Sequence, residues 1–233
     1  MTATLGPLSK RTSETLTLVA VLALFAFYYL ARADLIGSSS AARGWFVHTG
    51  RPLTAAQHYL ASALLLGILP VVAARWLCGL RLGELGLGLG RWRAGLALLV
   101  VGIPLALLAG QIGSAAPAMR AVYPLYPAAT DSLPGFAPQA LLQFLYYGSW
   151  EVLFRGVLLF GLKERLGPGA ANVLQTALSV TAHFGRPLAE TFSALPAGLV
   201  FGWLNLRVGS LWYVAIIHWL VGASLDWFVL ATY

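Results

Sequence analysis

The chain of 233 residues is 59% hydrophobic and only 10% charged, and its mean hydropathy is +0.77. These values exclude an ordinary water-soluble domain, in which about half of the residues are apolar and about a quarter are charged. The net charge of +7 does not indicate a nucleic-acid-binding protein, because no basic cluster with interleaved aromatic residues is present. We therefore expect one integral membrane domain over residues 1–233, with the lipid bilayer as a partner.

Seven apolar segments are long enough to cross a bilayer as helices, since about 20 residues suffice. They cover residues 15–33, 55–79, 94–114, 138–162, 167–184, 188–206 and 209–231. Each span must be helical, because the bilayer offers no water to the polar groups of the backbone. The first segment lacks a small-residue cleavage site before Arg32, which predicts a retained helix. The predicted fold is all-α and polytopic, with about seven transmembrane helices.

Basic residues between the spans predict the orientation, because cytoplasmic loops carry an excess of Lys and Arg. With the N-terminus in the cytoplasm, the inner loops hold Lys10, Arg11, Arg75, Arg81, Arg91, Arg93, Lys163, Arg165 and Arg207. The outer loops then hold Arg32, Arg43, Arg51, Arg120 and Arg186. We therefore expect a multi-pass protein whose N-terminus is cytoplasmic.

The fourth segment contains "WEVLFRG", which places Glu151 and Arg155 four residues apart inside an apolar helix. This spacing puts both side chains on one helix face, where they can pair. Charged side chains inside a span are costly and rare, and they usually mark a functional site.

Further polar residues follow in the later spans and their ends: His183, Arg186, Glu190, His218 and Asp226. The first three spans contribute almost no polar side chains, and we interpret His58, near the start of the second, as interfacial. The concentration of His and carboxylate residues predicts a single shielded site within the last four spans.

Such a set of side chains is suited to hydrolysis. A carboxylate can take a proton from water, while a neutral His holds that water or donates a hydrogen bond to an oxyanion. Two His and a carboxylate can instead bind zinc, which activates water directly. No His-Glu-x-x-His pair is present, and no Ser lies in a Gly-x-Ser-x-Gly setting. We therefore expect no cofactor and no metal, with zinc as the alternative.

The order and spacing of these motifs resemble the CPBP family, the CAAX-protease and bacteriocin-processing enzymes, which are intramembrane glutamic-type endopeptidases. The resemblance implies a catalytic core over residues 138–231. The family's Glu-Glu-x-x-x-Arg motif matches at Glu151 and Arg155, its Phe-x-x-x-His motif at His183, and its His-x-x-x-Asn motif at His218.

Three positions depart from the family pattern: Trp150 replaces the first Glu, Ser179 the aromatic residue and Gly222 the Asn. The first Glu is the family's general base, and a Trp cannot accept a proton. One hypothesis is a rewired site, in which Glu151 or Glu190 is the base and Asp226 or Arg186 supplies the lost polar contact. The other is a non-catalytic membrane binding or scaffold protein. We favour rewiring, because a site without activity would gain nothing from charged and His side chains kept in hydrocarbon.

The resulting prediction is an intramembrane endopeptidase of the cell membrane, specifically a bacterial inner membrane. Its substrates would be membrane-anchored or exported proteins or peptides with an apolar anchor, cut at leader or C-terminal sorting segments. The candidate catalytic residues are Glu151, Arg155, His183, His218, Glu190 and Asp226.

Overall fold

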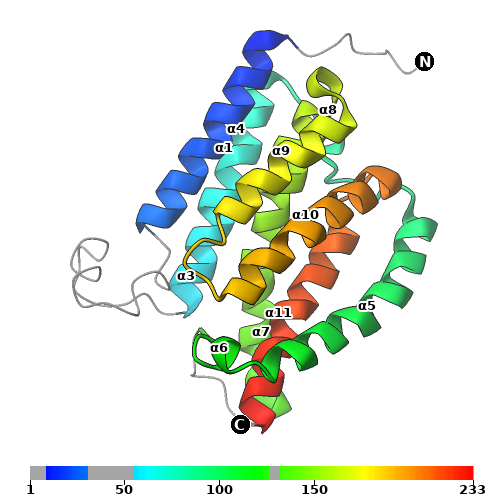
Figure 1. The fold of residues 1–233 in the computed structure, drawn as a ribbon. Helices are drawn as coiled ribbons and strands as arrows, with labels where there is room; N and C mark the ends of the chain where they lie inside the picture. The colour runs from blue at the N-terminus through cyan, green and yellow to red at the C-terminus, as the bar shows by residue number, and fades with distance from the viewer. Residues whose placement is uncertain (1–8, 31–54, 126–131, 233) are drawn as a thin grey trace.

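The computed structural model describes residues 9–30, 55–125 and 132–232, and these residues form helices and connecting turns without any strand. The elements are α1 (Lys10–Leu30), α3 (Ala55–Ser62), the π-helix η2 (Ala63–Ile68), α4 (Leu69–Cys78), the 3-10 helix η3 (Leu82–Leu85), α5 (Trp92–Ser114), α6 (Pro117–Arg120), α7 (Leu133–Glu151), the π-helix η4 (Val152–Phe160), α8 (Gly161–Leu166), α9 (Pro168–Thr181), α10 (Leu188–Val208) and α11 (Trp212–Thr232) (Figure 1). The expected all-α fold is confirmed.

Consecutive elements join into longer helices that correspond to the predicted spans. The second predicted span is the continuous run α3–η2–α4, and the fourth is the run α7–η4–α8. Helix α1 begins at Lys10, five residues before the predicted start of the first span. The end of that span, and the predicted outer-loop residues Arg32, Arg43 and Arg51, lie outside the described residues.

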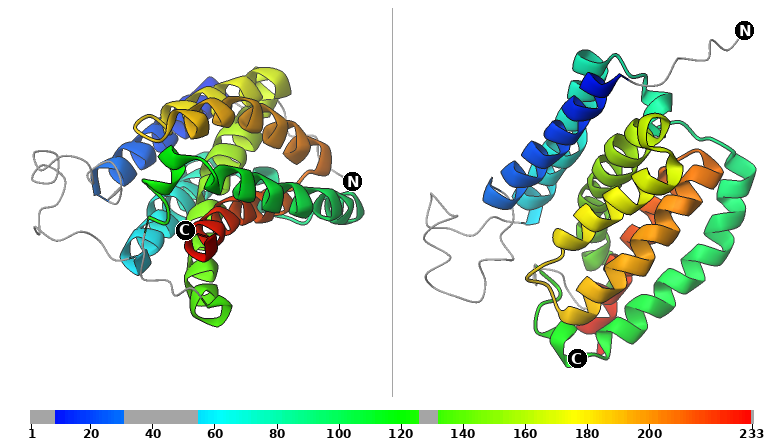
Figure 2. Two further views of the ribbon diagram at one scale, coloured as in Figure 1. Left: turned by 60° about the horizontal axis from the view of Figure 1, so that its bottom comes forward. Right: turned by 45° about the horizontal axis from the view of Figure 1, so that its top comes forward.

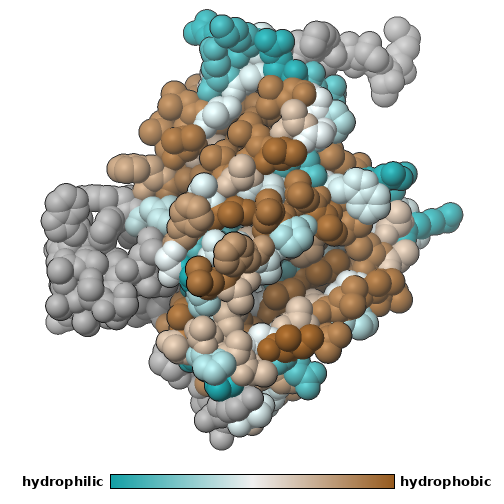
Figure 3. Space-filling model, viewed as in Figure 1, coloured by the Kyte–Doolittle hydropathy of each residue, from teal (hydrophilic) through white to brown (hydrophobic). Residues whose placement is uncertain are grey.

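Four helical segments of the described chain are long and apolar enough to cross a membrane: Lys10–Tyr28, Ala56–Cys78, Trp92–Ser114 and Trp212–Thr232. Helix α9, the predicted fifth span, has 14 residues and is shorter than the roughly 20 needed for a full crossing. Apolar residues cover much of the face in Figure 3, whereas hydrophilic residues gather at the start of α1. The chain is therefore a polytopic membrane protein.

The π-helix η4, the middle part of the run α7–η4–α8, lies inside the helix bundle (Figure 2). All nine residues of η4 are buried, and Leu153, Phe154 and Leu158 belong to a hydrophobic cluster that also contains Leu16 of α1 and Leu66 of η2. The π-helical turn is a recurrent feature of functional sites, and here it follows Glu151 directly. Burial on every side explains why this segment is apolar all round apart from Arg155.

Small residues allow the outer helices to approach closely. A Cβ atom at Gly198 of α10 would lie 2.7 Å from Cγ2 of Thr176 on α9. On the other side of the bundle, a Cβ atom at Gly102 of α5 would overlap the side chain of Ile217 on α11. Helices α9 and α10 therefore form one closely packed pair, and α5 and α11 form another.

Several basic residues of the predicted inner loops lie at helix ends: Lys10 and Arg11 at the start of α1, Arg75 near the end of α4, and Lys163 and Arg165 in α8. In Figure 1, the start of α1, the end of α4 and helix α8 lie at the upper end of the molecule, whereas the end of α11 lies at the opposite end.

Candidate active site

Glu151 and Arg155 form an ion pair in the interior, as their spacing predicts. Oε1 of Glu151 lies 3.0 Å from Nη1 of Arg155, and the two side chains are 0% and 2% exposed. A buried charge is tolerated only when it is compensated, so each member of this pair requires the other. The second carboxylate oxygen, Oε2, has no hydrogen-bond partner among the described residues.

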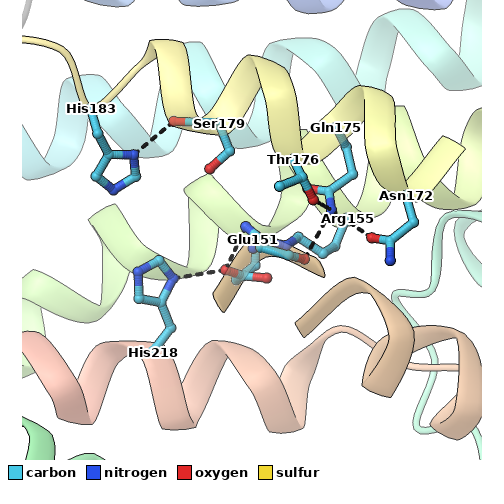
Figure 4. Close-up of polar contacts among 9 residues, drawn as sticks. Glu151, Arg155, Asn172, Gln175, Thr176, Ser179, His183 and His218 are labelled. Carbon is cyan, nitrogen blue, oxygen red and sulfur yellow. Dashed lines mark hydrogen bonds and ion pairs between the residues drawn. The ribbon is translucent and has the colours of Figure 1, made fainter. Parts of the chain in front are cut away.

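The same carboxylate oxygen also binds His218 of α11. Nδ1 of His218 lies 2.8 Å from Oε1 of Glu151, and the His218 side chain is 20% exposed. When Glu151 is ionised, Nδ1–H donates to the carboxylate, and the neutral ring keeps Nε2 as a proton acceptor. Figure 4 shows the two side chains pointing toward each other across the helices. His218 is thus the member of this group that remains accessible.

His183 approaches from the other side of α7. It lies in the turn after α9, and its Nδ1 is 2.7 Å from the carbonyl oxygen of Ser179. Because a carbonyl only accepts, Nδ1 carries the proton and Nε2 is the acceptor. The ring is packed edge-on against Trp150, with the ring centroids 5.2 Å apart.

Trp150 therefore occupies the face of α7 that meets His183. The indole is 3% exposed and packs against Phe154 with the rings tilted by 39° and the centroids 4.7 Å apart. Its Nε1 has no hydrogen-bond partner among the described residues. An indole N–H can donate but cannot accept a proton, so this side of the site has a hydrophobic wall where the family pattern has a carboxylate.

His58, interpreted from the sequence as interfacial, is buried within the helix bundle. Its side chain is 1% exposed and packs against the rings of Phe27 and Tyr146, with centroid separations of 5.7 and 5.5 Å. Helix α1 and helix α7 cover it from two sides. A helix-packing partner of this kind has no signature in the local sequence.

Tyr147 was not predicted, and it lies beside His218. The two rings are 4.8 Å apart between centroids and nearly perpendicular. A Cβ atom at Gly222 would overlap the Tyr147 hydroxyl, so this hydroxyl fills the space that any larger side chain at residue 222 would need. Gly222 is therefore required for Tyr147 to reach α11.

Asp226 lies further along α11, where Nε2 of Gln143 donates a hydrogen bond to its Oδ2 over 3.0 Å. Asp226 is 2% exposed and Gln143 is 5% exposed, so Asp226 is buried and not at a wet interface. In the described residues its hydrogen bond goes to Gln143 of α7 and to no other side chain of the candidate set.

The three contacts between α7 and α11 form one regular array, which we call the polar seam: Gln143 with Asp226, Tyr147 with Gly222, and Glu151 with His218. On each helix the members are four residues apart, so they share a face. The equal spacing in both helices could have revealed the seam in the sequence, but only together with the register of one helix against the other.

Glu190 forms a separate cluster. The Tyr123 hydroxyl donates to its Oε2 over 2.8 Å, and Nε of Arg186 lies 3.9 Å from its Oε1. Burial raises the pKa of Tyr123 well above its usual value, Arg186 lowers it and the Glu190 carboxylate raises it. Tyr123 therefore stays a neutral donor, and Glu190 is already engaged away from Glu151.

No group of three or more His, Cys, Asp or Glu side chains suited to a metal ion occurs in the described part of the chain. The side chains that could bind a metal already have other partners: Glu151 pairs with Arg155, His183 bonds to a backbone carbonyl and Glu190 accepts from Tyr123. This arrangement suits acid–base chemistry on water.

Residues 134–224 match the family model of Rce1-like proteins, the type II CAAX prenyl endopeptidases. This segment is similar to the Rce1-like endopeptidases. The resemblance expected from the motifs is thereby confirmed, and the Rce1-like segment (residues 134–224) includes every candidate catalytic residue except Asp226. Comparisons with curated proteins and with solved structures gave no match. The matched family implies a membrane protease.

Proposed function

We propose that this protein is an intramembrane endopeptidase in which His218 activates water and Glu151 acts through it. The observation that carries the proposal is the hydrogen bond between the fully buried Glu151 and the partly exposed His218. A carboxylate on one ring nitrogen fixes the tautomer and stabilises the imidazolium that forms when the other nitrogen takes a proton.

Burial favours this division of roles over direct action by Glu151. Oε1 of Glu151 is shared by Arg155 and His218, and the side chain is 0% exposed. In the proposed reaction, Nε2 of His218 takes a proton from water while the hydroxide oxygen bonds to the scissile carbonyl carbon. When the peptide C–N bond breaks, the proton returns from His218 to the leaving amine. Arg155 keeps the Glu151 charge compensated throughout.

His183 has a supporting role in this proposal. Its Nδ1 is held by the Ser179 carbonyl, so its Nε2 can accept a hydrogen bond from the attacking water. We assign Glu190 and Asp226 no proton transfer, because the hydrogen bonds of Glu190 go to Tyr123 and those of Asp226 to Gln143.

The proposed substrates are membrane-anchored or exported proteins and peptides with an apolar anchor, cut at leader or C-terminal sorting segments. This chain has helices apolar enough to lie in the bilayer. A substrate with an apolar anchor would be held in the same bilayer, which supports this class of substrate. We propose a bacterial inner membrane with the N-terminus in the cytoplasm, on the distribution of basic residues. A prenylated C-terminus is a substrate by analogy with the matched family.

The alternative is a non-catalytic binding or scaffold protein, and the buried indole of Trp150 next to His183 favours it. Zinc hydrolysis is the further chemical alternative. Both are decided by the same experiment.

The test is quantitative mapping of protein termini in a null strain rescued by wild type, His218→Ala or Glu151→Gln at equal expression. The matched control is Gln139→Ala, a substitution on α7 outside the candidate set. We expect termini that wild type and the control generate and that both site variants lose. Termini restored equally by all four proteins would overturn the endopeptidase proposal, and loss of activity of the purified protein in a chelator would favour zinc.

A further inference from the structure

The middle member of the polar seam, Tyr147, has an unused hydroxyl. Its ring contacts Tyr146 and His218, and no hydrogen bond to the described residues engages its oxygen. The residues above and below it on the seam are both committed, Glu151 to His218 and Gln143 to Asp226. Tyr147 is half-buried, so its hydroxyl is neither sealed in the core nor fully solvated.

The position of this hydroxyl is set by two features. The ring of Tyr147 contacts the ring of His218. Because Tyr147 precedes Glu151 by four residues, the two side chains lie one helical turn apart on the same face of α7. The hydroxyl then extends into the space beside the backbone of Gly222, one turn beyond His218 on α11. The donor thus stands next to the ring that takes the proton, on the seam between the two helices.

We propose that the Tyr147 hydroxyl is the hydrogen-bond donor to the oxyanion of the tetrahedral intermediate, a role that rests on the proposed function. When hydroxide bonds to the scissile carbonyl carbon, the C=O electron pair moves onto the carbonyl oxygen. That oxygen accepts the hydrogen bond of Tyr147 while His218 holds the proton taken from water. When the C–N bond breaks, the C=O bond reforms, the proton passes to the amine, and Tyr147 is unchanged.

The pairing of a large residue with a glycine gives this role its structural basis. Residue 222, one turn from His218 on α11, has no side chain that could donate a hydrogen bond, and the hydroxyl from α7 takes up that volume. Any side chain added at residue 222 must displace the hydroxyl. The same role therefore predicts two sensitive positions, Tyr147 and Gly222, on two different helices.

The test is the rate of cleavage of a substrate identified by terminus mapping, measured with the full-length protein in lipid nanodiscs. Tyr147→Phe removes the hydroxyl and keeps the ring against His218. We expect kcat to fall by about a hundred- to a thousand-fold, the usual effect of losing one oxyanion donor, with KM little changed. Tyr146→Phe, the same change at the adjacent residue, is the matched control and should retain the wild-type kcat.

A second variant separates the hydroxyl from the fold. Gly222→Ala keeps Tyr147 but displaces its hydroxyl, and we expect a fall in kcat comparable to that of Tyr147→Phe. Thermal unfolding of each variant shows whether the folded protein is being assayed. A structural role of Tyr147 alone would lower the unfolding temperature and leave the kcat of the folded fraction near wild type, which would overturn the proposal.

The outcomes distinguish this inference from the proposed function. If Tyr147→Phe retains full kcat while His218→Ala abolishes cleavage, the oxyanion role of Tyr147 is wrong and the endopeptidase proposal stands. If wild type and His218→Ala cleave equally or not at all, both are wrong. A loss of kcat in Tyr147→Phe and Gly222→Ala, with Tyr146→Phe active, establishes the tyrosine as a catalytic residue.

Discussion

Gln143 of α7 donates a hydrogen bond over 3.0 Å to Asp226 of α11, and both side chains are buried. This contact lies two turns along α7 from the Glu151–His218 contact and fixes the same register between the two helices. The polar seam is therefore a structural feature at one end and a candidate reaction centre at the other.

Asp226→Ala should destabilise the fold by about 1–3 kcal/mol, because it leaves the Gln143 amide buried without its acceptor. We expect the protein that remains folded to cleave substrate at the wild-type rate. Thermal unfolding in detergent micelles, combined with kcat of the folded fraction, tests this. A large fall in kcat at unchanged stability would return Asp226 to the catalytic set.

Arg155→Met should lower the stability by about 3–5 kcal/mol, since it leaves the buried Glu151 carboxylate without its charged partner and with only the His218 hydrogen bond. The double variant Glu151→Gln/Arg155→Met removes both charges and should be more stable than Arg155→Met alone. The yield of folded protein from membranes and its unfolding temperature measure both effects. If the stability losses of Glu151→Gln and Arg155→Met add up to that of the double variant, the pair is not energetically coupled.

Trp150→Glu restores the residue of the family pattern, yet we expect it to impair this protein. The substitution removes a buried ring that packs on Phe154 and His183 and introduces a carboxylate into an apolar environment, which is costly. We expect less folded protein and no gain in cleavage, whereas Trp150→Phe should be tolerated better. Faster cleavage by Trp150→Glu would show that Trp150 is a defect in an otherwise ordinary site.

Glu190→Gln should leave kcat within a few-fold of wild type, because Glu190 binds Tyr123 and Arg186 away from the seam. Loss of all cleavage in Glu190→Gln would restore Glu190 as a candidate base.

The stability of the protein should fall at alkaline pH because of Tyr123. Since burial raises the Tyr123 pKa, the folded protein holds the phenol proton more tightly than the unfolded chain does. Stability is then fully present below the usual Tyr pKa of about 10 and falls as the pH rises above it. Unfolding measured at increasing alkaline pH should show a weaker fall in stability for Tyr123→Phe than for wild type, and an equal fall in both proteins would contradict this prediction.

The sequence predicts much of this architecture because hydrophobic length and i,i+4 spacing are local properties. Hydrophobic length alone predicts the spans, and i,i+4 spacing alone predicts the Glu151–Arg155 pair. The seam was out of reach, since Tyr147 and Gly222 acquire meaning only when α7 and α11 are aligned. The burial of His58 was out of reach for the same reason, because the rings packed against it come from α1 and α7.

Helix α1 reaches the candidate site from outside the Rce1-like segment. The hydroxyl of Tyr28 donates a hydrogen bond to the carbonyl of Ala182, the residue before His183, and Phe27 closes the aromatic cluster around His58. An excised fragment limited to residues 134–224 would lose the anchor of its histidine turn. The smallest unit worth transplanting into another protein therefore starts at α1, because boundaries drawn at residues 134 and 224 would remove the helix that holds the turn before His183.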